Sequence, residues 1–217
     1  MKTLVDLFLP VECAGCGAGG VVLCIRCAGA FDGPFDVQRP ALAHDPPVHA
    51  LGVYRDAARA VVLAFKERGR RDLALPLGRM MAAVLPTLEV GPAEDGTWWL
   101  VPAPSRAVAA RRRGGSHMVA LARCMAAAMS MRGHQAAVAP ALKVARGVRD
   151  SAGLGAAARI VNLAGRVRVH PAGAPPPGVS VVVLDDVVTT GATAAACAEA
   201  LKSGGLEVTV VLSLTAT

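Results

Sequence analysis

The segment of residues 179–193 constrains the fold of this chain most. It reads VSVVVLDDVVTTGAT, so an apolar run ends in two carboxylates, Asp185 and Asp186, and a hydroxyl-rich loop around Gly191 follows. An apolar run of this length after the turn PAGAPPPG predicts a strand, at 179–184, that is buried on both faces, as in a parallel sheet. A helix is predicted to begin where the loop ends. Because ligands of open parallel sheets bind at the carboxyl ends of strands, we expect a ligand site here.

The rest of the chain predicts further strands that alternate with helices. The predicted strands are 48–54, 97–101, 136–139, 179–184 and 207–214, and the predicted helices follow residue 56 or span 75–88, 116–131, 151–163 and 193–203. This alternation indicates an α/β fold, a parallel sheet flanked by helices. A hydrophobic fraction of 53% with only 3% aromatic residues suits small aliphatic side chains packed on such a sheet.

Four cysteines near the start form a second pattern, C-x2-C-x7-C-x2-C, at Cys13, Cys16, Cys24 and Cys27. Each C-x2-C pair can present two sulfurs to a tetrahedral ion from one tight turn, whereas a redox role would use one pair and leave the other idle. The spacing therefore predicts a structural zinc site. We expect a zinc-binding mini-domain at 1–33, a proline-rich linker at 34–47 and a main domain at 48–217.

The loop after the main strand combines groups that suit a phosphorylated sugar. The start of a helix attracts anions, and the hydroxyls of Thr189, Thr190 and Thr193 can donate hydrogen bonds to phosphate oxygens. The carboxylates of Asp185 and Asp186 would repel a phosphate and instead need hydroxyl donors, such as those of a ribose. A ribose 5-phosphate unit fits both halves.

This segment resembles the signature of the type I phosphoribosyltransferases, an apolar strand, two acidic residues and a T-[TG]-G-x-T loop. The resemblance implies a phosphoribosyltransferase-like fold that binds phosphoribosyl pyrophosphate, with magnesium bridging its oxygens. It also implies that Asp185 and Asp186 hold the ribose and act as the catalytic residues, stabilising positive charge at the anomeric carbon. The implied ligand-binding residues are Asp185, Asp186, Val187, Val188, Thr189, Thr190, Gly191, Ala192 and Thr193.

The four-cysteine module together with this domain resembles the ComF family, the competence-associated phosphoribosyltransferase-like proteins. The blocks that agree are YRDAARAVVLAFKERGRRDLALPLGRMM, LVPAPSRAVAARRRG and RIVNLAG. The resemblance implies a hood over the sheet and, for some members, a part in DNA uptake. Its implied pyrophosphate and hood candidates are Lys66, Ala103, Pro104, Ser105, Arg106 and Arg113. Two departures remove amides expected near a substrate: Gly115, Ser116 and His117 replace Phe-Asn-Gln, and Ser151 replaces a glutamine.

Two classes of function stay open on these residues. One is an enzyme that transfers phosphoribose to or from a base, and the other is a non-catalytic nucleotide-sensing or docking module in DNA uptake. The net charge of +7, or +5 once four thiolates hold one zinc, suits phosphorylated metabolites or nucleic acid without deciding between them. Few aromatic residues argue against a stacking surface for single strands. We expect no membrane insertion and a cytoplasmic protein, because apolar runs are short and Asp6 interrupts the start.

Overall fold

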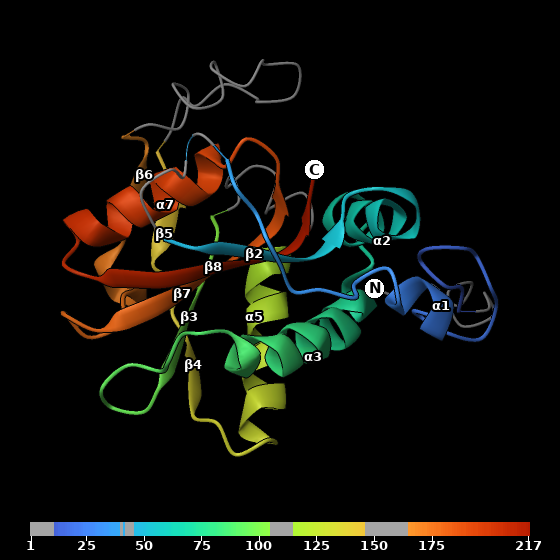
Figure 1. Cartoon of the computed structure of the whole chain (residues 1–217), viewed down its shortest axis with the longest axis horizontal. Coiled ribbons are helices and arrows are strands. Elements are labelled where there is room, and N and C mark those ends of the chain that lie inside the picture. The colour runs from blue at the N-terminus through green and yellow to red at the C-terminus, as the bar shows by residue number, and fades with distance from the viewer. Residues whose placement is uncertain (1–10, 40, 42–45, 105–114, 146–164) are drawn as a thin grey trace.

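The computed structural model describes residues 11–39, 41, 46–104, 115–145 and 165–217. A six-stranded sheet lies at its centre, in the order β1-β2-β8-β7-β3-β4 (Figure 1). Every neighbouring pair is parallel except β1 with β2. The strands are β1 (Phe35–Asp36), β2 (Val48–Val53), β3 (Trp98–Pro102), β4 (Ala136–Val138), β7 (Ser180–Val188) and β8 (Glu207–Ala216). The predicted α/β class with a mostly parallel sheet is confirmed.

Helices cover both faces of the sheet and form two cores. On one face α2, α3 and α5 pack against side chains such as Val182 and Leu184 of β7, and on the other face α7 packs against Val181 and Val183. Successive residues of a strand point to opposite faces, so β7 supplies both cores in alternation. These helices are α2 (Asp56–Glu67), α3 (Ala74–Val84), α5 (His117–Ser130) and α7 (Ala192–Ser203).

The order of the strands creates a switch point between β3 and β7. From β3 the chain passes through α5 to β4 on one side, whereas from β7 it passes through α7 to β8 on the other side. At such a point the two connections diverge above the carboxyl ends of neighbouring strands, which is where open α/β sheets bind their ligands.

The strand β7 is longer than the sequence predicts. It continues past Leu184 to Val188 because β8 runs beside it, pairing Ser213 with Asp185 and Ala216 with Val188. Both motif carboxylates therefore belong to a strand and not to the loop, and neighbouring strand residues face opposite sides of the sheet.

The N-terminal segment carries α1 (Ile25–Ala28) and lies beside α2 (Figure 1). Part of the expected linker forms the edge strand β1. Beyond the main sheet, β5 (Leu142–Val144) pairs with β6 (Val167–Val169). The described residues also form the 3-10 turns η3 (Arg71–Leu73), η4 (Leu85–Thr87) and η5 (Pro171–Gly173). The expected helix at 151–163, the RIVNLAG block apart from its last residue, Gly165, and Ser105, Arg106, Arg113 and Ser151 lie outside the described residues. Within the described ranges, no helix is long and apolar enough to cross a membrane.

Candidate functional site

The two segments expected to bind the ligand lie next to one another. Pro102 at the end of β3 pairs with Leu184 of β7, and the amide of Ala103 donates a hydrogen bond of 2.8 Å to the carbonyl of Leu184. Pro104 follows and is half-buried. The VPAP turn and the motif loop therefore share one edge of the sheet, at the switch point.

The motif loop leads directly into a helix. Gly191 has φ 80°, a left-handed conformation that a side chain would strain, and α7 begins at the next residue. The hydroxyl of Thr190 accepts a hydrogen bond of 3.3 Å from the amide of Ala192, while Thr189, Thr190 and Thr193 are all half-buried. Amides of the first helical turn and three hydroxyl groups are thus gathered in one loop, an arrangement that suits an anion.

Asp186 is buried and has an ionic or hydrogen-bonding partner at each carboxylate oxygen. Its Oδ1 lies 2.9 Å from Nζ of Lys66 on α2, and its Oδ2 lies 2.7 Å from Nε2 of His117 on α5. Burial alone would raise the pKa of Asp186, but the Lys66 ammonium and His117 outweigh it and lower that pKa below its ordinary value. Asp186 is therefore an ionised carboxylate that faces the layer of α2 and α5.

Asp185 faces the opposite layer, near Cys197 of α7, and its pKa moves in the opposite direction. It is 6% exposed, and its Oδ1 accepts a hydrogen bond of 2.8 Å from the amide of Asp186. Burial, followed by repulsion from the Asp186 carboxylate, raises the pKa of Asp185 to about 7. Two adjacent carboxyl groups with pKa values moved in opposite directions are typical of functional sites.

His117 is the residue of this constellation that the sequence did not reveal. It is 5% exposed and its ring packs edge-on against Phe65, with ring centroids 5.3 Å apart. Its contact with Asp186 forms because α5 packs beside β7 in the folded chain. His117 and Asp186 are 69 positions apart, so no local spacing could have indicated it.

A linker residue also reaches the motif loop. Nε of Arg39 donates a hydrogen bond of 2.6 Å to the carbonyl of Thr189, and its Nη2 donates to the carbonyl of Thr217. The guanidinium therefore ties the loop to the end of β8.

Replacing Arg39 by Ala should loosen this loop without unfolding the sheet. We expect faster amide hydrogen exchange in residues 189–191, and roughly three- to tenfold weaker binding of any anion held there, because a charged hydrogen bond is lost. Arg123→Ala, which removes the same charge from an exposed position on α5, is the control. Unchanged exchange in the loop of Arg39→Ala would show that Arg39 does not restrain it.

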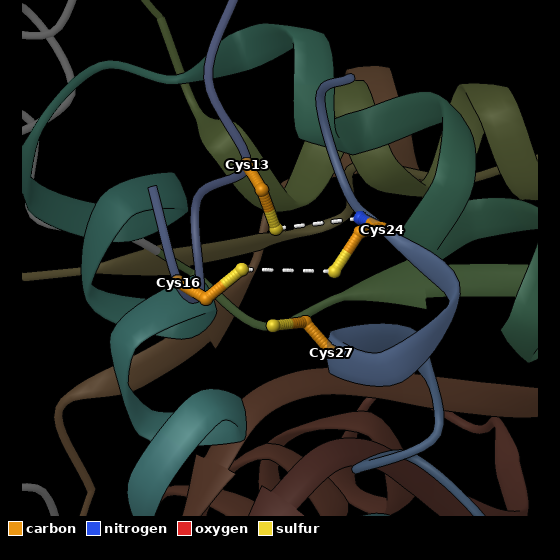
Figure 2. A group of neighbouring side chains, drawn as sticks. All are labelled: Cys13, Cys16, Cys24 and Cys27. Carbon is orange, nitrogen blue, oxygen red and sulfur yellow. Dashed lines mark hydrogen bonds between the residues drawn. The ribbon is translucent and has the colours of Figure 1, made fainter. Parts of the chain in front are cut away.

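The four cysteines near the start form a cluster that could hold a metal ion (Figure 2). Their sulfurs all lie within 4.8 Å of one another, and Sγ of Cys16 lies 3.7 Å from Sγ of Cys24. Four sulfurs at about 2.3 Å from a tetrahedral zinc are separated by about 3.8 Å, so the spacing fits. Gly15 is required nearby, because a Cβ there would lie 2.6 Å from Sγ of Cys27.

The thiols of the cluster differ in how readily they form the thiolate that metals bind. Burial would raise the pKa of Cys13, but hydrogen bonds from backbone groups, first among them the amide of Cys24 at 3.3 Å, lower it to about 6. Burial raises the pKa of Cys27 to about 12, helped by the neighbouring sulfurs. Mutual repulsion of this kind is relieved when a divalent cation occupies the centre.

The fold defines an open α/β protein with a mostly parallel sheet, in which the motif loop and the VPAP turn lie at a switch point. No protein-family model and no curated protein matches the chain. Among solved structures it is similar to the UMP synthase of Leishmania donovani, at 17% identity and a TM-score of 0.39. The similarity covers 88% of this chain and 31% of that one, so the chain spans about a third of the length of the protein it matches.

Proposed function

We propose that the protein is a type I phosphoribosyltransferase-like member of the ComF family that binds phosphoribosyl pyrophosphate or a related ribose 5-phosphate ligand. The observation that supports this best is the meeting of the motif loop and the VPAP turn at one edge of the sheet, joined by the hydrogen bond from Ala103 to Leu184. A ligand with a phosphate at one end and a pyrophosphate at the other can span two such loops.

The chemistry of each part assigns it a portion of the ligand. The 5-phosphate would be held by the loop from Thr189 to Thr193, and the pyrophosphate by the turn at Ala103 and Pro104. The carboxylates of Asp185 and Asp186 would hold the ribose hydroxyls, and magnesium bound with the ligand would offset its negative charge. Ser105, Arg106 and Arg113 remain candidates for the pyrophosphate and hood on the strength of the resemblance alone.

Calorimetric titration with phosphoribosyl pyrophosphate, with and without magnesium, tests the proposal. Thr190→Val should weaken binding through the phosphate and Asp185→Asn through the ribose and magnesium, each by about ten- to a hundredfold. Thr209→Val is a matched control, because Thr209 lies on β8 and its hydroxyl donates to the carbonyl of Val181 within the sheet. Wild-type affinity in both site variants would refute the assignment, as would the absence of binding by a folded wild type.

A second candidate function is a non-catalytic nucleotide-sensing or docking module that acts in the cytoplasm with the DNA-uptake machinery. The observation that favours it is the occupied carboxylate of Asp186, whose two oxygens contact Lys66 and His117. A carboxylate neutralised in this way contributes less to stabilising a developing positive charge. Turnover of labelled phosphoribosyl pyrophosphate with a panel of bases separates the two candidates.

For the cysteine cluster we infer a structural zinc, because all four ligands come from the protein and none of the tetrahedral positions is left for a substrate. The ion would hold the N-terminal module in shape and supply no step of a reaction.

A further inference from the structure

His117 is a buried polar residue that has no role in the proposed binding of phosphoribose. It is the first residue of α5, and its ring is held between Phe65 and the Asp186 carboxylate. Its Nδ1 is buried without a hydrogen-bond partner in the described part of the chain. With the described residues, the ring therefore makes one polar contact, from Nε2 to Asp186.

The contact with Asp186 shows which ring nitrogen of His117 carries a hydrogen. An ionised carboxylate only accepts hydrogen bonds, so Nε2 must be the donor in this contact of 2.7 Å. His117 therefore acts on Asp186 as a hydrogen-bond donor through Nε2.

The side chains of His117, Asp186 and Lys66 differ in the fraction that is exposed to solvent. The side chains of His117 and Asp186 are 6% and 7% exposed, while that of Lys66 is 36% exposed. Of the three residues, Lys66 therefore offers the largest part of its side chain to solvent. The ammonium remains charged, because the attraction of Asp186 outweighs burial and raises the pKa of Lys66.

Two donors from two helices fix the direction of the Asp186 carboxylate. Lys66 lies in the last turn of α2 and His117 in the first turn of α5, so each oxygen is held from a different element. The backbone of Asp186 is held as well, because the Thr215 hydroxyl donates a hydrogen bond of 3.1 Å to its carbonyl. Without His117 the carboxylate could rotate about its side-chain bonds and Lys66 would lose a fixed partner.

We propose that His117 and Asp186 are positioning residues that hold the Lys66 ammonium at the ligand edge, and that Lys66 is the group that contacts the phosphate oxygens of the ligand. The contact with a phosphorylated ligand rests on the function proposed above. A free lysine side chain loses conformational freedom when it binds a ligand, whereas an anchored one has already lost that freedom. Asp186 then acts on the phosphate oxygens through Lys66.

The first test needs no ligand. Protons of a lysine ammonium exchange quickly with water unless the group is held, so the Nζ–H signal of Lys66 in 15N-labelled protein reports its anchoring. The signal, assigned by its loss in Lys66→Met, should be present in wild type and weakened or lost in His117→Leu. His117→Gln should restore it, because the amide Nε2 of glutamine can donate to the same carboxylate oxygen. An unchanged Lys66 signal in a folded His117→Leu protein would overturn the proposal.

The second test measures affinity for phosphoribosyl pyrophosphate with magnesium. His117→Leu should raise the Kd roughly tenfold, and His117→Gln should keep it within about threefold of wild type. Because His117 acts through Lys66, the double variant with Lys66→Met should bind no more weakly than Lys66→Met alone. If the two substitutions weaken binding additively in the double variant, His117 does not act through Lys66 and the proposal is refuted. If wild type does not bind while the Lys66 signal behaves as expected, the proposed function fails and the positioning of Lys66 stands.

Discussion

Replacing Cys27 by Ser should release the metal and unfold the N-terminal module. The purified wild type is expected to hold one zinc per chain and the variant close to none, because a serine hydroxyl is a poor ligand at a site of three remaining thiolates. Residues 11–33 contribute few buried side chains of their own, so metal binding, worth on the order of 10–16 kcal/mol in small zinc modules, is their main folding free energy. Metal analysis and the dispersion of the amide signals of these residues measure the change.

The matched control is Cys124→Ser, which changes a half-buried thiol of α5 outside the cluster and should keep the zinc. The main domain should also lose stability in Cys27→Ser, because Ala14, Val22 and Leu23 of the module pack against the core that contains α2. A variant that retains stoichiometric zinc would contradict the four-cysteine assignment. So would a metal-free wild type whose four thiols titrate freely in an ordered module.

The order of strands and helices could be predicted because it depends on local patterns. The apolar run of β7 indicates a strand buried on both faces, and the spacing of Met118, Leu121 and Met125 indicates the buried side of a helix. The cysteine spacing likewise predicted a cluster, since each pair is local in sequence. The short elements β1, β5 and β6 span two or three residues each and carry too few positions for a periodicity to be recognised.

The contacts that shape the candidate site could not be predicted in the same way. Lys66 lies 120 positions from Asp186, and Arg39 lies 150 positions from Thr189. Helical periodicity says which side of α2 is apolar but not which strand residue its last turn will meet. The sequence also did not predict where β7 ends. The strand continues through the two carboxylates because it pairs with β8, whereas the sequence pattern assigns both residues to a loop.

This extension of β7 gives the two carboxylates separate environments. Asp186 contacts the Lys66 ammonium and His117 and is ionised, whereas Asp185 lies on the other face and contacts no cation among the described residues. The acidic pair of the motif is therefore not one site with two equal groups. A substitution at each position should have a different consequence for stability as well as for binding.

At pH 8 the Asp185→Asn variant should be more stable than the wild type, by on the order of 2–4 kcal/mol in the free energy of unfolding. Burial and then repulsion from Asp186 raise the pKa of Asp185 to about 7, against 3.8 for the ordinary group. Between these values the folded protein holds a proton that the unfolded chain releases. The contribution of Asp185 to stability is therefore fully present below about pH 4 and is lost as the pH rises through 7. Asparagine does not ionise, so the variant should not lose stability in this way as the pH rises.

Urea unfolding of both proteins at pH 5, 6, 7 and 8 measures this difference, which should be smallest at pH 5 and largest at pH 8. Glu199→Gln, at an exposed position of α7, is the control and should show no such trend. A difference that is constant across this range would mean that Asp185 is already ionised in the folded state at pH 5. The same substitution is expected to weaken the binding of magnesium and ligand, because these would recruit the ionised form. A variant that gains stability at pH 8 and loses affinity would indicate that the buried carboxyl of Asp185 is kept at a cost to the fold for the sake of the ligand.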